Sequence, residues 1–577
     1  MTDTAARAAP RDIAEAALAA LPPARPPLLS LVSDGTILVY GDGPAAVEAG
    51  VRLADALNVT VLLDDGELTP VPADLPFPVA RGRIASASGH FGAYQAVVDG
   101  YLAPDGMALP RDGAVSRCDV LLDLCSASPP MFPAHEARDG YLKADPSDLA
   151  ALDAAIAEAA DLVGEFEKPQ YIAFRKELCV HSRSSITGCT RCLDACAMQA
   201  IAPAGDHVTI DPYVCAGCGN CAAVCPTGAA AYTLPGVDMQ LDRLRTLLTR
   251  YRAEGGRDAV ILFHDGYVGQ PLLDAIGPAL PAHVLPIAVN EIKQIGLESL
   301  AAAFAYGASS VGILARVAPK NGIATLSGTV ELAGAFTAAL GYGEDCCQIL
   351  HADTPHEVLA GLAALPLGRP APQPASFAPV GSKRDLLETS LRMLHQVAPA
   401  QVERIALPSG APFGSVHVEA DGCTLCHACV TACPTGALSA SEERPLLSFS
   451  HGACVQCGLC EATCPERVVT LQPELDFAAW NGPRRILKEE EPFCCIRCAK
   501  PFGARSTIER IVAKLEGKHW MFAGDNARRL DAIRMCEDCR VEAVLNEGID
   551  PYAGTARPKP RVAEDYDAPA DPGTRRN

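Results

Sequence analysis

The sequence predicts a multidomain protein of α/β plus α+β class, and three observations lead to this prediction. Strand and helix patterns alternate strictly in the middle of the chain, which is typical of a parallel sheet covered by helices on both faces. Near the N-terminus a strand, a glycine turn, a helix and a second strand follow one another, which indicates a βαβ unit. Two cysteine-rich stretches flank the middle part, and their spacings repeat.

The first cysteine-rich stretch contains two runs. The second run reads Cys-x2-Cys-x2-Cys-x3-Cys-Pro, the pattern that places three thiolates on one 4Fe-4S cluster and the fourth on a neighbouring cluster. In the first run one spacing is widened by the insert between Cys179 and Cys189, and Ala197 stands in place of the proline. In this pattern the fourth cysteine of each run binds the cluster of the other run. The two runs therefore predict two clusters, one held by Cys179, Cys189, Cys192 and Cys225, the other by Cys215, Cys218, Cys221 and Cys196.

The second stretch repeats this arrangement with two regular runs, each followed by a proline. Cys189 lies 237 residues before Cys426, and Cys225 lies 239 residues before Cys464, so the two stretches are interpreted as a duplicated module. The same exchange predicts two further clusters, one held by Cys423, Cys426, Cys429 and Cys464, the other by Cys454, Cys457, Cys460 and Cys433. We therefore predict four 4Fe-4S clusters, and each module resembles a bacterial dicluster ferredoxin.

Disulfides and zinc sites are the alternatives for these thiols. Disulfides need an oxidising compartment, and a zinc site pairs Cys-x2-Cys units and leaves no role for a third cysteine of the run. The insert between Cys179 and Cys189 leaves one further alternative, in which that cluster has an exchangeable iron.

The composition favours a soluble protein of a reducing compartment. A length of 577 residues suggests about three to five domains. Residues 1–25 lack the pattern of a secretory signal, and no apolar run approaches the roughly 18 to 20 residues that span a bilayer. The net charge of −21 disfavours nucleic acid as a partner and suits either solubility or docking to a basic patch on a redox protein. We expect a cytoplasmic protein with redox protein partners and leave its oligomeric state open.

The predicted domains follow one another along the chain. We expect an N-terminal helical arm (1–30), a Rossmann-like domain (31–165), ferredoxin module 1 (166–236), a parallel α/β domain (237–366), a linker (367–380), ferredoxin module 2 (381–480), a C-terminal zinc-knuckle-like domain (481–549) and a disordered tail (550–577).

The patterns also predict individual elements. Strands are expected at 36–40, 59–63, 118–125, 258–263, 283–289, 309–314, 347–352 and 416–420, and a β-like pattern interrupted by glycines covers 79–99. Helices are expected at 148–163, 239–253, 269–276, 297–306, 328–340, 355–365, 383–397, 507–515 and 527–535. Ser147 is expected to cap the helix that follows it. Core packing is the expected role of Cys118, Cys125, Cys346 and Cys347.

The N-terminal βαβ unit carries a weak dinucleotide fingerprint. Gly41, Gly43 and Ala46 stand at its positions in the turn, and Asp64 follows the second strand. Asp42, however, puts a carboxylate where a pyrophosphate would lie. We therefore expect neither flavin nor NAD and interpret the unit as structural, while nucleotide binding at these three residues stays as the alternative.

Two Cys-x2-Cys knuckles occur near the C-terminus. They suit a tetrahedral structural zinc, for which a fifth iron–sulfur centre and free thiols are the alternatives. The expected ligands are Cys495, Cys498, Cys536 and Cys539, and Cys494 is left over.

Five segments carry a resemblance to a known family: "GEFEKPQYIAFRKELCVHSRSSITGCTRCLDAC", "GCTLCHACVTACPTGAL", "ACVQCGLCEATCPERV", "CAKPFGARSTIERIVAKLEG" and "MCEDCR". With them the chain resembles the large four-cluster ferredoxin-type protein found with molybdenum or tungsten formate dehydrogenases of proteobacteria. The middle segment "LPIAVNEIKQIGLESLAAAFAYGASSVGIL" looks like the small iron-sulfur subunit that links hydrogenase to heterodisulfide reductase. Asn290 and Glu291 stand where that family has a cluster cysteine, so the likeness implies the fold and not the cluster.

Three functions fit these observations. One-electron relay through four clusters is the leading hypothesis, because no residue has the features of a catalytic acid, base or nucleophile. The resemblance implies that this relay serves a formate dehydrogenase. The first alternative is a flavin-dependent NAD(P)H oxidoreductase subunit. The second is an accessory scaffold in formate dehydrogenase maturation.

Overall fold

The computed structural model describes residues 9–64, 69–104, 109–126, 128–132, 138–319, 322–441, 444–480, 482–516, 522 and 529–546. The chain forms two compact units, the first made of Met1–Pro412 and Pro473–Ala478 and the second of Phe413–Gln472 and Ala479–Asn577. The tail expected at 550–577 lies outside the described residues. None of the helices in the described ranges has both the length and the apolar composition needed to cross a membrane.

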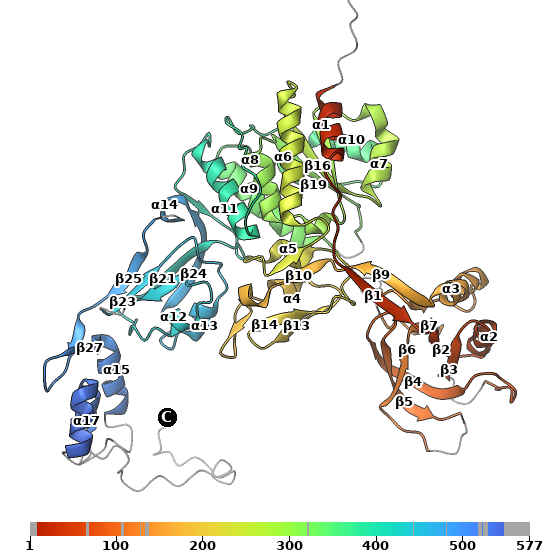
Figure 1. The fold of residues 1–577 in the computed structure, drawn as a ribbon, viewed down its shortest axis with the longest axis horizontal. Helices are drawn as coiled ribbons and strands as arrows, with labels where there is room; N and C mark the ends of the chain where they lie inside the picture. The colour runs from red at the N-terminus through yellow and green to blue at the C-terminus, as the bar shows by residue number, and fades with distance from the viewer. Residues whose placement is uncertain are drawn as a thin grey trace, which may run out of the picture. The chain divides into compact units, whose positions relative to one another are not determined.

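The N-terminal part of the first unit is built on a seven-stranded sheet (Figure 1). Its strand order is β6-β5-β4-β3-β2-β7-β8, with β2 paired in parallel to both β3 and β7. The elements are β2 (Thr36–Gly41), α2 (Pro44–Leu53), β3 (Asn58–Leu63), β4 (Val79–Ser88), β5 (Tyr94–Leu102), β6 (Ala114–Cys118), β7 (Val120–Leu124) and β8 (Tyr141–Lys143).

The single strand predicted at 118–125 is wrong, because the chain changes its place in the sheet there. Strand β6 ends at Cys118 beside β5, and β7 begins at Val120 beside β2. Asp119 holds the crossing point, since its carboxylate accepts hydrogen bonds from the backbone N–H (2.9 Å) and the hydroxyl (2.7 Å) of Thr36. This pairing joins residues that are 83 positions apart, so local periodicity could not reveal it.

Helix α3 (Leu149–Asp161) packs on this sheet, and its cap differs from the prediction. Asp148, and not Ser147, is the N-cap: its carboxylate accepts hydrogen bonds from the backbone N–H groups of Ala150 and Ala151, both at 3.1 Å. The Ser147 hydroxyl donates to Asp145 instead.

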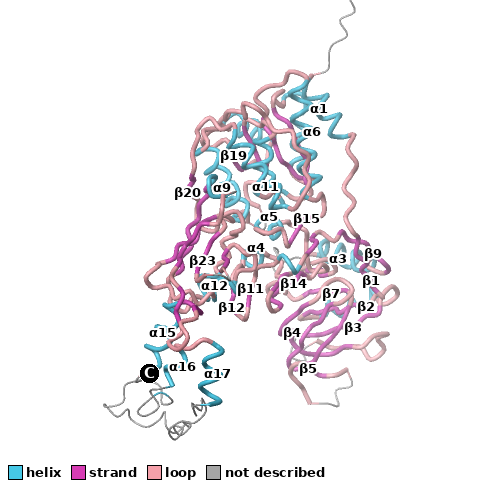
Figure 2. The backbone as a smooth tube through the Cα atoms, turned by 60° about the vertical axis from the view of Figure 1, so that its left-hand side comes forward, coloured by secondary structure: helices cyan, strands magenta, loops and turns pink. Residues whose placement is uncertain are grey.

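A two-stranded ribbon that the sequence did not predict leaves this domain. Strand β1 (Leu28–Ser33) pairs antiparallel with β9 (Gly164–Pro169) over six residues. Before the ribbon, helix α1 (Pro10–Ala19) packs against α6 (Val237–Ala253) of the middle domain, and Arg11 donates to the carbonyl of Leu280 at 3.0 Å. The N-terminal arm thus belongs to the middle domain in space (Figures 1 and 2).

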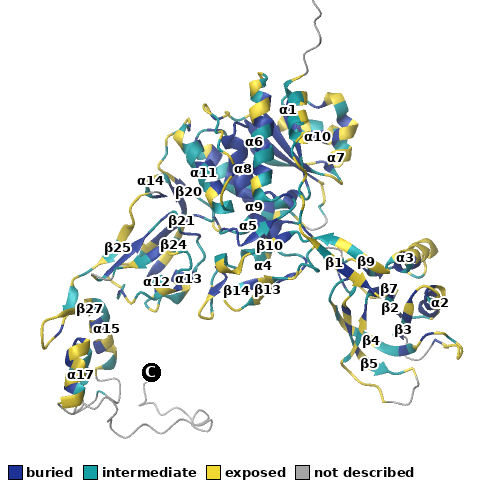
Figure 3. Cartoon of the chain, in the orientation of Figure 1, coloured by how far each residue is buried: buried dark blue, intermediate teal, exposed yellow. Residues whose placement is uncertain are grey.

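The middle domain confirms the predicted parallel sheet. Strands β16 (Val260–Asp265), β17 (Val284–Val289), β18 (Ser310–Ala315) and β19 (Cys347–His351) pair in parallel in the order β17-β16-β18-β19. Helices α7 (Gly269–Ile276) and α10 (Pro355–Ala364) cover one face; α6, α8 (Leu297–Ala305) and α9 (Ala324–Ala339) cover the other. Figure 3 shows the strands of this sheet as buried.

Helix α8 is buried at all nine positions, because α11 (Lys383–Gln396) packs over it. The sequence groups α11 with the second ferredoxin module, whereas it lies in the first unit. The preceding proline-rich segment is bound to the middle domain: Ser310 donates to the carbonyl of Pro366 (2.6 Å), and Ala375 N–H donates to that of Ala305 (2.8 Å).

The cysteine runs lie on short helices joined by small hairpins. In the first unit these elements are β10 (Ile172–Phe174), α4 (Arg191–Ala195), β13 (Ile201–Ala204), β14 (His207–Ile210), α5 (Asn220–Val224) and β15 (Ala230–Tyr232). In the second unit they are β21 (Gly414–Val418), α12 (Ala428–Ala432), β22 (Leu438–Ala440), β23 (Leu446–Phe449) and α13 (Leu459–Thr463). In each unit the two helices that carry cysteines pack against each other.

The second unit ends in a small domain. It contains β26 (Pro492–Cys494), β27 (Pro501–Ala504), α15 (Arg505–Leu515), α16 (Arg529–Ile533) and α17 (Glu537–Asn546). The two strands form an antiparallel hairpin, and its turn carries the first cysteine knuckle.

The cap of α3 provides a test of the fold. Replacing Asp148 by Ala should cost about 1 kcal/mol locally, because two N–H groups lose their acceptor. Hydrogen exchange of the first-turn amides should then be about fivefold faster in the full-length protein. Ser147→Ala is the matched control and should leave these amides unchanged; equal effects of the two substitutions would contradict the assignment of the cap.

Candidate iron–sulfur and metal centres

The insert in the first cysteine run folds into a β-hairpin. Strands β11 (Ser182–Arg183) and β12 (Ile186–Thr187) pair antiparallel, and Ser184 and Ser185 form the turn with φ of 52° and 65°. Cys189 N–H donates to the carbonyl of Val180 at 3.2 Å, which closes the hairpin. The insert therefore returns the chain to its starting point, and Cys189 lies close to Cys179.

The four cysteines predicted for the first cluster lie near one another. Burial raises the pKa of Cys192 to about 12, and the thiols of Cys189, Cys225 and Cys179 contribute to this shift. The Cys225 sulfur also accepts a hydrogen bond from the backbone N–H of Ala230 at 3.5 Å. Cys225, from the second run, is thus a neighbour of the first run, as the exchange of fourth cysteines requires.

The other four thiols of this module form a second group. Burial raises the pKa of Cys221 well above its usual value, with further contributions from Cys215, Cys218 and Cys196. Cys192 of the first group contributes as well, so the two groups are adjacent.

The second module shows the same pattern around a small cavity. The cavity is lined by Cys423, Cys426, Cys429 and Cys464 together with Thr424, Leu425, His427, Leu447, Pro465, Glu466, Val468 and Val469. Burial raises the pKa of Cys429 to about 12, and the three other thiols add to the shift. Four sulfur donors around a largely apolar hollow suit an iron–sulfur cluster.

The remaining group of this module also combines residues from both runs. Burial raises the pKa of Cys457, and the neighbouring thiols of Cys433 and Cys454 raise it further. Cys433 lies 21 positions before the run that it joins. Gln456 donates from its amide to the Cys454 sulfur at 3.3 Å, so a polar side chain is bound at this sulfur.

These surroundings fit 4Fe-4S clusters. The ligand must be a thiolate, and burial raises the pKa of Cys192, Cys221, Cys429 and Cys457, which favours their protonated form when no metal is bound. A cluster would supply the positive iron charge that stabilises the thiolates, and the N–H donor at Cys225 would help to tune it.

The C-terminal knuckles bring four sulfurs much closer together. The sulfurs of Cys495, Cys498, Cys536 and Cys539 all lie within 4.8 Å of one another, and those of Cys498 and Cys536 are 3.6 Å apart. A tetrahedral site with metal–sulfur bonds of about 2.3 Å has sulfurs about 3.8 Å apart. The arrangement therefore fits one metal ion.

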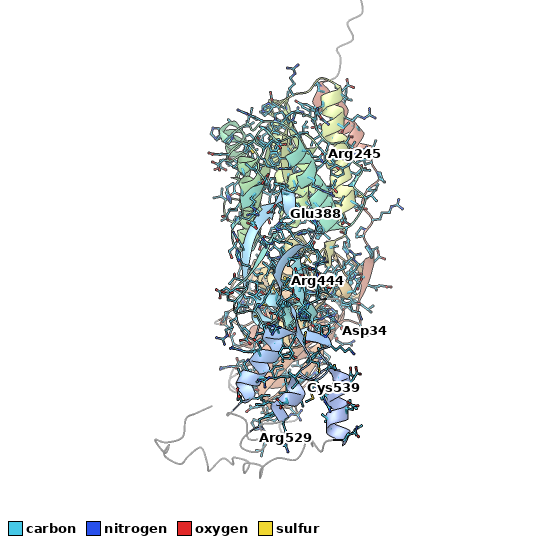
Figure 4. The ribbon with its side chains drawn as sticks, turned by 90° about the vertical axis from the view of Figure 1, so that its left-hand side faces the viewer. Asp34, Arg245, Glu388, Arg444, Arg529 and Cys539 are labelled. Atoms are coloured by element: carbon cyan, nitrogen blue, oxygen red, sulfur yellow. The ribbon has the colours of Figure 1, made fainter. Side chains whose placement is uncertain are left out.

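Backbone N–H groups and the first turn of a helix surround the thiols of this site. Burial opposes ionisation of Cys495, but hydrogen bonds from the N–H groups of Cys498, Cys536 and Arg497 lower its pKa. Cys539 lies in the first turn of α17 (Figure 4), and the neighbouring thiol of Cys498 together with burial raises its pKa to about 12. Cys494 is exposed and stands outside the group.

The residues of the nucleotide fingerprint are engaged within the protein. A Cβ on Gly41 would lie 2.7 Å from that of Ala46, so Gly41 allows the close approach of strand and helix. Gly43 precedes α2 in extended backbone with open space around it. Asp42 accepts hydrogen bonds from the N–H (3.1 Å) and the hydroxyl (2.8 Å) of Ser126, between the ends of β2 and β7. That point is where ligands bind in sheets of this type.

Of the predicted core cysteines, Cys118 and Cys347 lie in strands β6 and β19, and Cys125 and Cys346 lie next to strand ends. Cys118, Cys125, Cys346 and Cys347 are all buried, and burial raises the pKa of each thiol. The structure also brings two lysines to the ferredoxin modules that no sequence spacing indicated, Lys383 and Lys488.

Comparison with known proteins identifies both cysteine-rich stretches. The family described as 4Fe-4S dicluster domain matches residues 187–229 and 422–469. The first match begins after Cys179, so that cysteine lies outside it.

The similar proteins include an iron-sulfur subunit and an electron transfer subunit. The chain is 28% identical over 118 residues to the iron-sulfur subunit of the nitrate-inducible formate dehydrogenase of Escherichia coli, covering 18% of this chain and 40% of that subunit. It is 32% identical over 96 residues to the thiosulfate reductase electron transfer subunit PhsB of Salmonella typhi, covering 15% of this chain and 50% of that protein. The chain thus spans half or less of the length of these relatives.

The knuckle site leads to a prediction about metal content. Replacing Cys536 and Cys539 by Ser should reduce bound zinc from about one per chain to nearly none and speed hydrogen exchange in α15 and α17, because structural zinc contributes directly to folding. The visible absorbance of the iron–sulfur clusters should not change.

Cys494→Ser is the matched control, since this neighbouring cysteine stands outside the group, and it should retain the zinc. Iron in place of zinc in the isolated protein would contradict the zinc assignment.

Proposed function

We propose that this chain is an electron-transfer protein that carries four 4Fe-4S clusters and relays single electrons for a formate dehydrogenase. Electron transfer by iron–sulfur clusters is supported by the two dicluster domains and by the similar iron–sulfur subunits. The number of clusters and the formate dehydrogenase are the further parts of the proposal.

One observation carries the count of four. In both modules the fourth cysteine of each run is a neighbour of the other run, as seen for Cys225 beside Cys192 and for Cys464 beside Cys429. Each module therefore offers two complete sets of four sulfur donors, and the sets within a module are adjacent. Adjacent clusters suit hopping of electrons within a module.

The chain's own residues set the environment of such a relay. A bound cluster would take up and release one electron at a time. Buried hydrophobic side chains around the thiols exclude water, and backbone and side-chain donors hold individual sulfurs, as at Cys225 and Cys454. In this proposal the knuckle site holds zinc, which has no redox chemistry and keeps the C-terminal domain folded.

The proposed partner rests on similarity. The formate dehydrogenase subunit matches the chain in part, and the resemblance of the flanking segments points to the same enzyme class. The thiosulfate reductase subunit matches a comparable share of the chain, so the cluster domains by themselves do not distinguish these two enzymes as partners.

The first test counts iron. The anaerobically purified protein should contain about sixteen irons and sixteen acid-labile sulfides per chain, since four clusters hold four of each. Cys225→Ser should lower the iron content by up to about four and change the signal of the cluster of the first run, because this thiol is shared between runs. Cys494→Ser should keep the full content. About eight irons in the unsubstituted protein would contradict the four-cluster proposal.

A second test concerns the electron donor. Formate together with a formate dehydrogenase should bleach the cluster absorbance, whereas NADH or NADPH should not. Acid precipitation should release no flavin, because Asp42 occupies the point where a dinucleotide phosphate would bind. One flavin per chain in the supernatant would instead favour an oxidoreductase with its own nucleotide site.

A further inference from the structure

Two lysines outside the cysteine runs contact cluster cysteines in the same way. Lys383, the first residue of α11, donates through Nζ to the carbonyls of Ala222, Ala223 (2.6 Å) and Cys225 (3.2 Å). In the second unit Lys488, on β25 (Arg485–Glu489), donates to the carbonyl of Cys423.

Both contacts fall on corresponding clusters. Cys225 completes the set formed with the first run of module 1, and Cys423 opens the set formed with the first run of module 2. The two lysines come from different elements, and Lys383 follows Cys225 by 158 residues. The same contact thus arises twice from unrelated parts of the chain.

Each lysine is nearly buried beside a glutamate. The exposed fraction of the Lys383 side chain is 10% and that of Lys488 is 12%. The Lys383 ammonium lies 3.5 Å from a carboxylate oxygen of Glu298, whose side chain is 6% exposed, and the Lys488 ammonium lies 3.7 Å from Glu490. Within the described residues this Glu298 oxygen accepts no hydrogen bond, so the ion pair is its main interaction there.

Burying an ammonium costs free energy, and an ion pair offsets this cost only in part. Capping the carbonyls at the end of a five-residue helix is one use of such a lysine, and an uncharged donor could serve it as well. A fixed positive charge has a second effect beside a cluster. Reduction adds one negative charge to the cluster, and a nearby cation in a medium of low dielectric constant stabilises that charge.

We propose that Lys383 and Glu298 form a potential-setting ion pair for the cluster held by Cys179, Cys189, Cys192 and Cys225, and that Lys488 has the same role in module 2. The Lys383 ammonium donates a hydrogen bond to the backbone carbonyl of Cys225. The Glu298 carboxylate contacts the ammonium and not this cysteine. The lysine therefore raises the reduction potential of the cluster, and the glutamate lowers it by a smaller amount. This inference rests on the proposed four clusters.

The test is a redox titration of the full-length protein, followed by low-temperature electron paramagnetic resonance. At a fixed solution potential, Lys383→Met should lower the ratio of reduced to oxidised cluster about tenfold, which is a shift of about 59 mV for a one-electron couple. Glu298→Gln should shift the ratio in the opposite direction, and Lys383→Arg should stay close to the unsubstituted protein. Opposite signs separate electrostatics from damage, because loose packing at the cluster would shift both variants the same way.

The N-terminal domain supplies a matched control. Lys143 pairs there with buried Asp123 at 3.0 Å, and its ammonium donates to Asp123 and to the carbonyl of Cys125. Lys143→Met should leave every cluster potential unchanged. Lys488→Met repeats the measurement in module 2 and decides the question if Lys383→Met fails to assemble its cluster.

The outcomes distinguish this inference from the proposed function. An assembled cluster whose potential does not move in Lys383→Met or Lys488→Met would overturn the inference and leave the four clusters intact. Shifts of the same sign in Lys383→Met and Glu298→Gln would also overturn it. Absence of the first-run cluster from the unsubstituted protein, shown by iron content and signal intensity, would overturn both.

Discussion

In the proposed four-cluster arrangement, the exchange of fourth cysteines between neighbouring runs is the constraint on which both modules depend. A cluster that takes three ligands from one run and one from the other can form only when the two runs fold against each other. Helices α4 and α5 in the first unit, and α12 and α13 in the second, are each five residues long and would be unstable alone. In this proposal the packing of the helices depends on the clusters that their cysteines hold, so cluster binding is coupled to folding.

This dependence explains why the insert in the first run is tolerated. An extra loop between two ligands is harmless if its two ends lie close together. The hairpin of β11 and β12 meets this condition, because the backbone N–H of Cys189 donates a hydrogen bond to the carbonyl of Val180. Loop closure costs little extra free energy as a loop grows. The sequence shows that the spacing between two ligands has changed. It does not predict the hairpin, because the two serine residues that form its turn with positive φ are not a strong turn signal.

Patterns that repeat locally could be read from the sequence, and contacts between distant segments could not. The four parallel strands of the middle domain and the helices between them were predicted within a few residues, because each has its own apolar periodicity. The β1–β9 ribbon joins segments more than 130 residues apart, and Asp119 splits one apolar run between two places in a sheet. The knuckle cysteines were recognised by spacing, whereas Lys383 reaches Cys225 only through the packing of α11 on α8.

The carboxyl end of strand β17 in the middle domain lies against the first ferredoxin module. In open parallel sheets, ligands bind beyond the carboxyl ends of the strands. Here the chain that leaves β17 meets the first ferredoxin module: the Asn290 amide donates to the Tyr232 hydroxyl at 2.8 Å, and a Cβ on Gly219 would lie 2.5 Å from Gln294. Asn290 thus contacts the first ferredoxin module through its side chain. The edge of the sheet that would otherwise receive a ligand thus serves as a support for the neighbouring cysteine run.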